Sequence, residues 1–351
     1  MGSSSFNPAN WGVGAKITAF TFGLVGIILA ALVFTISLTT SALLESRAGA
    51  SVASELRGVL NMVALFDKAV TSEAVGFSRI LAASYSGAFS IDADTVDIAG
   101  VSLPVLKNDG KPVNLDFTIA DRFTAQTGAI ATVFVRSGED FVRVSTSIKQ
   151  QDGARAVGTM LDRAEPAYAM LRAGQAYSGP AAAFGRQFIT RYEPILGAGG
   201  RLIGALSVGV DITADMLALK AKIREIKIGD TGYFFVLNSA PGKGLGELLV
   251  HPVKEGANLL GAKDSDGRLF IQEVLEKKTG VISYPWLNAE KGETTPREKS
   301  VTYGWYPQWN WVIAGGTYKD EITREAASLR NRYIGFGLVA LTVFAVLLFL
   351  M

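Results

Sequence analysis

The strongest constraint in this sequence is a run of 28 residues, Ile17 to Leu44, without a charged side chain. An α-helix rises about 1.5 Å per residue, so about 20 residues already cross the hydrocarbon core of a bilayer. We therefore expect a transmembrane helix over residues 17–43. A cleavable signal peptide is the alternative, because Lys16 would supply its basic flank and Ala48-Gly49-Ala50 resembles a cleavage site. The apolar part of a signal peptide, however, usually has only about 7 to 15 residues.

A second uncharged run, residues 333–351, follows Arg330 and Arg332. As a helix it would span about 28 Å, which is barely enough to cross the hydrocarbon core. Because the run stops at the last residue without a polar exit, we expect a truncated second transmembrane helix and a truncated piece of a longer protein. Two spans place both ends of the chain on one side of the membrane and the middle on the other. Basic residues flank both sides, so the positive-inside rule does not orient the chain.

Composition narrows the chemistry that the middle segment can carry. Hydrophobic residues make up 49% of the 351 residues and charged residues 19%, which excludes a disordered chain. A formal charge of +2 provides no strong field for nucleic acid. The absence of cysteine excludes thiol catalysis and Cys-ligated metals, and a single histidine, His251, excludes a multi-His metal site within one chain. We therefore expect no catalytic residue, no metal, no cofactor and no nucleic-acid partner.

The hydrophobic pattern after the first run predicts a long helix. No proline occurs between Pro8 and Pro104, and two rows of mostly apolar residues recur every seven positions. This periodicity indicates one helix from the membrane to about Ser90, with a stripe against a partner surface. We assign residues 44–96 to this stalk, and a hairpin broken at Gly76 is the alternative. The two rows are Leu56, Val63, Val70 and Phe77, and Val59, Phe66, Glu73 and Ile80.

The segment from about residue 101 to 329 is mixed α and β and contains an internal repeat. In the first half, Thr127-Gly128 precedes a hairpin signal, ATVFV followed by FVRVSTSI; in the second, Thr231-Gly232 precedes YFFVLN. Each half then continues with a helical crossing and antiparallel strands, and residues 213–226 form a helix-like connector. Two units of the same order indicate a tandem repeat. Antiparallel sheets with helices and a long N-terminal helix are the layout of PAS-like sensor modules.

Several segments resemble the Cache 3/Cache 2 fusion family. Three segments of this chain are similar to the Cache 3 half of that family: TGAIATVFVRSGEDFVRVSTSIKQQDGARAVGTMLD, GQAYSGPAAAFGRQFITRYEPI and GALSVGVDI. Four later segments are similar to its Cache 2 half: IKIGDTGYFFVLN, HPVKEGANLL, GVISYPW and WNWVIAGGTYKDEI. The resemblance covers nearly the whole segment between the apolar runs. It implies an α+β fold with a long stalk helix, a membrane-distal Cache module at 97–212 and a membrane-proximal Cache module at 213–329.

The same resemblance implies the periplasmic sensor of a bacterial methyl-accepting chemotaxis receptor. Residues 1–16 would then be cytoplasmic, and the chain would cross the inner membrane twice. Such receptors form homodimers and continue into a HAMP domain and a helical hairpin that controls a histidine kinase with its coupling protein; this sequence ends before those parts. Other expected partners are membrane lipid and a small-molecule ligand or periplasmic binding protein. The alternatives are the ectodomain of a sensor histidine kinase or cyclase, and a membrane-anchored hydrolase.

The first module offers a set of residues suited to an amino acid or a small organic acid. An Arg guanidinium can hold a carboxylate through two hydrogen bonds, tyrosines can wall a pocket, and Asp can take an ammonium group. The alternative is that Arg143 and Arg186 are solvated on an outer sheet face and that Asp211 caps the connecting helix. The candidate residues are Arg143, Thr146, Tyr168, Tyr177, Arg186, Tyr192 and Asp211.

The second module offers a lysine among aromatic residues. A Lys299 cation surrounded by Tyr284, Trp286 and Tyr303 would face an acid, and some Cache 2 modules that resemble this run bind carboxylates there. His251 precedes a predicted turn and could line the same cleft. The alternative is that these aromatic residues only pack the core and edge of a small sheet domain.

Overall fold

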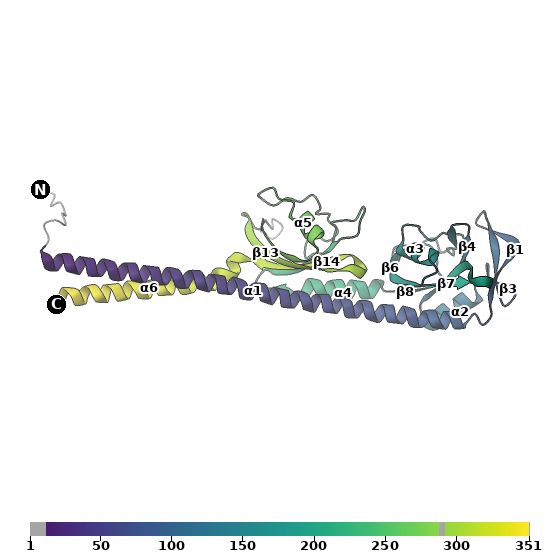
Figure 1. The fold of residues 1–351 in the computed structure, drawn as a ribbon, viewed down its shortest axis with the longest axis horizontal. Coiled ribbons are helices and arrows are strands. Elements are labelled where there is room, and N and C mark those ends of the chain that lie inside the picture. Colours follow the sequence, from purple (N-terminus) through teal and green to yellow (C-terminus); the bar gives the residue numbers. More distant parts are fainter. Residues whose placement is uncertain (1–11, 288–291, 351) are drawn as a thin grey trace. The chain divides into compact units, whose positions relative to one another are not determined.

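The computed structural model describes residues 12–287 and 292–350 (Figure 1). These residues form two compact units. Unit 1 contains the chain up to Arg57, Ile226–Trp305 and the chain from Val312 onward. Unit 2 contains Gly58–Glu225 and Tyr306–Trp311. Each unit is therefore discontinuous in sequence.

Helix α1, Val13–Ala83, is continuous over 71 residues, and the alternative of a break at Gly76 is wrong. The helix also ends earlier than the predicted boundary near Ser90, because residues 89–98 form strand β1. The chain turns after Ala83 and passes so close to Asp109 that a Cβ atom at position 87 would clash with the Asp109 side chain. Gly87 therefore permits this turn.

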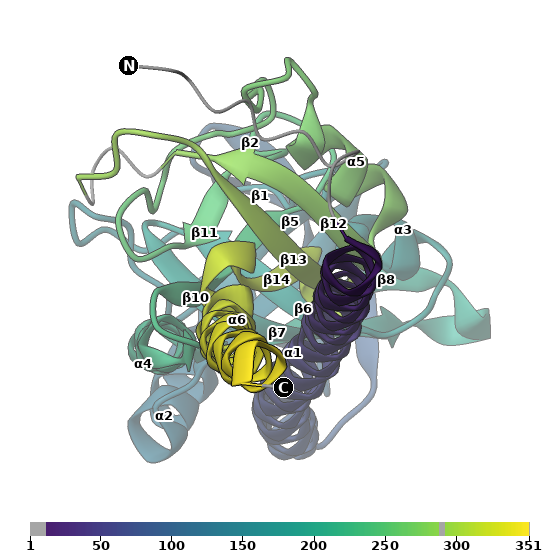
Figure 2. The same ribbon diagram turned by 90° about the vertical axis from the view of Figure 1, so that its left-hand side faces the viewer.

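Within residues 12–287 and 292–350, two helices are long and apolar enough to cross a membrane by length and composition. They are α1 and α6, Lys319–Leu350. Figures 1 and 2 show α6 running alongside the N-terminal part of α1. The most apolar window of each helix is not buried inside the described structure.

The core of unit 1 is a sheet with the strand order β11-β10-β14-β13-β12, and β9 pairs with β10. Helix α5, Phe270–Lys277, packs against this sheet, and the Phe270 ring stacks on Tyr284 with centroids 4.1 Å apart. The strands are β9 Lys227–Ile228, β10 Gly232–Asn238, β11 Leu248–Val250, β12 Gly280–Trp286, β13 Arg297–Tyr306 and β14 Trp311–Tyr318.

Unit 2 is built on a five-stranded sheet with the order β5-β4-β8-β7-β6. Numbered along the chain within each unit, this is the same arrangement as β11-β10-β14-β13-β12, which agrees with the predicted repeat. A second sheet, β1-β2-β3, was not predicted. The elements are β1 Phe89–Ile98, β2 Val101–Asn108, β3 Lys111–Pro112, α2 Thr118–Thr127, β4 Ile130–Ser137, β5 Asp140–Thr146, α3 Pro166–Arg172, β6 Tyr177–Ala183, β7 Arg186–Leu196, β8 Leu202–Asp211 and α4 Thr213–Glu225.

Within unit 2, Asp67 of α1 binds the turn that connects β13 to β14. The Tyr306 hydroxyl donates to Oδ2 of Asp67 at 2.8 Å, and Nε1 of Trp309 donates to Oδ1 at 2.7 Å. The Phe66 ring contacts Trp309 edge-on, with centroids 5.6 Å apart. Both oxygens of one carboxylate are thus used to hold this turn, and burial raises the pKa of Tyr306, reinforced by the Asp67 carboxylate.

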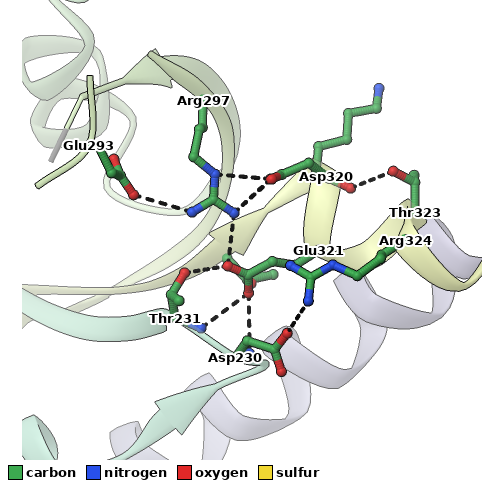
Figure 3. Close-up of polar contacts among 10 residues, drawn as sticks. Asp230, Thr231, Glu293, Arg297, Asp320, Glu321, Thr323 and Arg324 are labelled. Atoms are coloured by element: carbon green, nitrogen blue, oxygen red, sulfur yellow. Dashed lines mark hydrogen bonds and ion pairs between the residues drawn. The ribbon is translucent and has the colours of Figure 1, made fainter. Parts of the chain in front are cut away.

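Within unit 1, Arg297 of β13 connects the sheet to the first turn of α6 (Figure 3). Its Nη2 atom lies 2.8 Å from Asp320 and 2.9 Å from Glu321. Glu321 also accepts hydrogen bonds from the backbone N–H groups of Asp230 at 3.2 Å and Thr231 at 3.1 Å, and from the Thr231 hydroxyl. No residue separates β14 from α6. The start of α6 is therefore fixed to the sheet by the chain and by side chains.

Arg297→Gln should lower the free energy of unfolding by about 1 to 3 kcal/mol, because it leaves the carboxylate of Glu321, which is 5% exposed, without its cationic partner. Urea unfolding of the purified chain measures this loss. Arg268→Gln is the matched control: Arg268 pairs with Glu273 at 2.9 Å but its side chain is 45% exposed. The control should cost less than about 1 kcal/mol, and equal losses in the two variants would contradict the assignment.

Candidate functional site

Unit 2 contains a small cavity against its five-stranded sheet, with a volume of about 50 Å³. A water needs about 10 to 15 Å³ of such volume, so the cavity has room for about four waters. Apolar walls come from Ile130, Phe134 and Phe188. The polar residues that line it are Thr132, Arg143, Glu165, Thr190, Tyr192 and Ser207.

Arg143 is the cation of this cavity. It lies on β5, and its guanidinium is 5.0 Å from the centroid of the Phe134 ring. Nη1 donates to the Thr159 hydroxyl at 2.6 Å, whereas Nε and Nη2 donate to no residue that the structure describes. Burial lowers the pKa of Arg143, and the nearby Tyr192 and Glu165 oppose this effect. A partly buried guanidinium with available donors suits an anion that accepts two hydrogen bonds.

Glu165 is the anion of the same cavity. It is the N-cap residue of α3, directly before Pro166, and its side chain is partly buried. Burial raises the pKa of Glu165, while the Arg143 charge lowers it. A cation and a carboxyl group facing one small cavity are complementary to a ligand with both charges.

Hydroxyl groups complete the wall. Tyr192 on β7 lies opposite Ser207 on β8, and burial raises the pKa of Tyr192 to about 12, so this hydroxyl stays protonated. Thr132 on β4 shares a 2.7 Å hydrogen bond with Thr146 on β5. These groups can donate to or accept from a polar solute.

The structure brings together only part of the predicted distal set. Arg143 and Tyr192 line the cavity. Thr146 does not line it but shares a hydrogen bond with Thr132, which does. Tyr177 packs beside the Phe134 and Tyr192 cluster, and burial raises its pKa, with a contribution from the Glu165 charge.

Three other predicted residues do not line the cavity, although Tyr168, like Tyr177, packs against the cluster of Phe134 and Tyr192. The Tyr168 hydroxyl donates to the Glu139 carbonyl at 2.9 Å. Arg186 pairs with Asp211, which also accepts from the backbone N–H of Thr213 at 2.9 Å. Asp211 thus binds the first residue of α4, as the capping alternative states. Sequence reasoning missed Glu165, Thr132, Thr190 and Ser207, and the Glu-Pro pair at the start of α3 was the one signal that could have indicated Glu165.

Unit 1 contains a smaller cavity, about 10 Å³, lined by Lys299, His251, Trp286 and Tyr284 among other aromatic residues. Lys299 is 1% exposed, and its Nζ lies 3.7 Å from the Tyr233 ring centroid. Predicted residues Tyr284, Trp286 and Lys299 line this cavity, whereas Tyr303 is buried in the same core without lining it.

The polar groups of this second cavity are mostly hydrogen-bond donors. Nδ1 of His251 accepts from the backbone N–H groups of Val253 at 3.0 Å and Lys254 at 2.9 Å. The other ring nitrogen, Nε2, therefore carries the proton. Nε1 of Trp286 is buried and has no hydrogen-bond partner in the described structure. Together with the Lys299 ammonium, these donors favour a ligand that only accepts hydrogen bonds.

Two sheets of the same strand order, each with a small polar cavity, define a tandem sensor-module fold. The family model of the Cache 3/Cache 2 fusion domain matches residues 40–332, most of the chain. The chain therefore belongs to the Cache 3/Cache 2 fusion domain family and contains a Cache sensor domain.

Individual relatives share parts of this chain. The methyl-accepting chemotaxis protein McpP of Pseudomonas putida is 24% identical over 135 residues, which are 36% of this chain and 24% of McpP. The chain thus matches about a quarter of the length of that relative. The ligand-binding domain of the Campylobacter jejuni chemoreceptor Tlp3, solved with L-valine, is 13% identical, covers 81% of this chain and 98% of its own, and has a TM-score of 0.43. A methyl-accepting chemotaxis protein of Vibrio parahaemolyticus is 24% identical over 31% of this chain and 73% of its own, with a TM-score of 0.27.

Glu165→Gln should change how stability depends on pH. Because the folded-state pKa of Glu165 is raised, its stabilising contribution exists while the group is protonated and is lost as pH rises through that pKa. As pH rises from about 4, near the ordinary pKa of Glu, through the raised folded-state pKa, the unmodified protein should lose stability relative to Glu165→Gln. Thermal unfolding of both proteins in one buffer series at constant ionic strength measures the difference. A difference that stays constant or has the opposite sign contradicts this prediction.

Proposed function

We propose that this chain is the ligand-sensing region of a membrane-anchored bacterial chemoreceptor. In this proposal residues 17–43 and 333–351 cross the inner membrane, and the sensor between them lies in the periplasm as part of a homodimer. A ligand in the unit 2 cavity shifts the population of two sensor conformations. The direct connection of β14 to α6, fixed by Arg297, supports transmission of that change toward a HAMP and kinase-control region.

The ligand we propose is a small zwitterion, an amino acid of the size of glycine or alanine. The observation that carries this proposal is that Arg143 and Glu165 both line one cavity of about 50 Å³. The ligand carboxylate would bind the available Nε and Nη2 donors of Arg143, and its ammonium group would bind Glu165. A ligand with only one of these charges would leave the other, partly buried group without a charged partner, which costs free energy.

Alanine should raise the thermal unfolding midpoint of the purified chain more than propionate or ethylamine, each of which lacks one of its two charged groups. Arg143→Lys should abolish most of this rise, because an ammonium group cannot hold a carboxylate through two parallel bonds. Arg186→Lys, an exposed position on β7, is the matched control and should keep it. If propionate stabilises as strongly as alanine, the cavity takes an organic acid and Glu165 has no ligand role.

The unit 1 cavity favours a second ligand class, the smallest monocarboxylates. The specific observation is the buried Nε1 of Trp286 without an acceptor beside the buried Lys299 ammonium. A carboxylate would supply the acceptor that the Trp286 N–H lacks, and its negative charge would lie near the Lys299 ammonium. Because the cavity volume of about 10 Å³ is near the minimum for one water, binding of acetate requires the partly exposed Trp286 to move.

Acetate should therefore raise the unfolding midpoint, while acetamide, which is uncharged and of similar size, should not. Lys299→Met should abolish the acetate effect, and Arg143→Lys should preserve it, so the two cavities are tested separately. The thermal scans use equal ionic strength for all additives. If acetate still raises the unfolding midpoint of Lys299→Met, it does not bind at Lys299. The aromatic residues around Lys299 would then serve only to pack the core of unit 1.

A further inference from the structure

A larger cleft lies in unit 1 between α1, the start of α6 and the β9–β10 turn, with a volume of about 510 Å³. It is distinct from both cavities described above. Leu44, Val52, Ile228 and Ile322 supply apolar walls. The charged residues that line it are Arg47, Glu55, Asp230, Glu321 and Arg324.

Three of these five charges are satisfied within the protein. Arg324 pairs with Asp230 at 3.0 Å, and Glu321 binds Arg297 at 2.9 Å and the turn at residues 230 and 231 (Figure 3). The other two are not satisfied by any described residue. Arg47 is exposed and makes no ion pair or hydrogen bond with a described residue, and Oε2 of Glu55 is buried without a hydrogen-bond partner. A buried carboxylate oxygen without a donor costs free energy.

The order of these groups along α1 indicates what could satisfy them. Leu44 ends the long uncharged run, Arg47 follows three residues later, and Glu55 lies eight residues beyond Arg47. Arg47 and Glu55 are thus separated by about 12 Å along the helix axis at about 1.5 Å per residue. All side chains of a helix lean toward its N-terminus, so this tilt does not change the separation between Arg47 and Glu55 along the axis. Along α1 the cleft therefore presents, from the apolar run outward, the apolar Leu44, the Arg47 cation, the apolar Val52 and the Glu55 carboxylate.

We propose that this cleft binds a phosphate ester that carries a primary ammonium group, as phosphoethanolamine does. The phosphate binds Arg47, and the ammonium group donates a hydrogen bond to Oε2 of Glu55. A quaternary ammonium has no N–H donor and leaves that oxygen unsatisfied, so the cleft discriminates ethanolamine from choline. Free phosphoethanolamine and the headgroup of phosphatidylethanolamine share this chemistry, and the lipid source rests on the proposed membrane anchoring.

The test compares the full chain in nanodiscs of phosphatidylcholine with nanodiscs that contain an equal mixture of phosphatidylcholine and phosphatidylethanolamine. The thermal unfolding midpoint should be higher in the mixture, by about 3 °C. Glu55→Gln and Arg47→Gln should each abolish this difference. Glu73→Gln and Arg57→Gln, at exposed positions of α1 outside the cleft, should retain it. Because each variant is compared with itself in two lipids, its own effect on folding cancels.

A third sample, phosphatidylcholine nanodiscs with added phosphoethanolamine, separates the two sources. If phosphoethanolamine raises the unfolding midpoint as much as phosphatidylethanolamine does, the cleft binds the soluble compound. If only the lipid raises the midpoint, the cleft binds the lipid headgroup. No rise in either sample, or a rise that persists in Glu55→Gln, overturns the proposal. A chain that does not enter nanodiscs overturns the anchoring and the lipid source, and the same variants with phosphoethanolamine in buffer then test the cleft independently.

Discussion

The ion pairs of Arg297 with Asp320 and Glu321 fix how α6 leaves the sheet of unit 1. Two acidic residues in the first turn interact favourably with the helix dipole, but they also repel each other. Arg297 removes this conflict and at the same time attaches the helix to β13. Since β14 continues into α6 without a linker, any change in the strand positions must move the helix. A flexible connection at this point would absorb such a change.

The two sheets have one strand order but different cavity chemistry. In unit 2 the cavity contains a cation and a carboxyl group, Arg143 and Glu165. In unit 1 the corresponding sheet carries donors, Lys299, Trp286 and the Nε2 of His251, with aromatic walls. One repeated strand order thus carries two different sets of cavity side chains, because a few inward positions differ while the backbone arrangement does not.

The sequence patterns that succeeded are local ones. The uncharged run and the heptad spacing after it predicted most of α1, and the apolar segments after each Thr-Gly pair predicted strands of the two sheets. The end of α1 was placed too late because the contact of Gly87 with Asp109 involves residues distant in sequence. Arg143 stood out because a charge in the middle of a strand is unusual. Glu165 lies outside any strand, and only tertiary structure brings it to the cavity. Arg186 and Asp211 resembled a binding pair because neighbouring strand ends bring opposite charges together.

The binding of the β13–β14 turn by Asp67 has a consequence for how this architecture can evolve. Unit 2 is completed by Tyr306–Trp311, residues that the chain reaches only after most of unit 1 has been synthesised. Recombination that transferred only residues 58–225 to another protein would separate the Asp67 carboxylate from its two donors, Tyr306 and Trp309. Exchange of sensor modules between receptors should therefore preserve both repeats as one inherited block, and the acidic residue on the stalk should vary together with the aromatic turn.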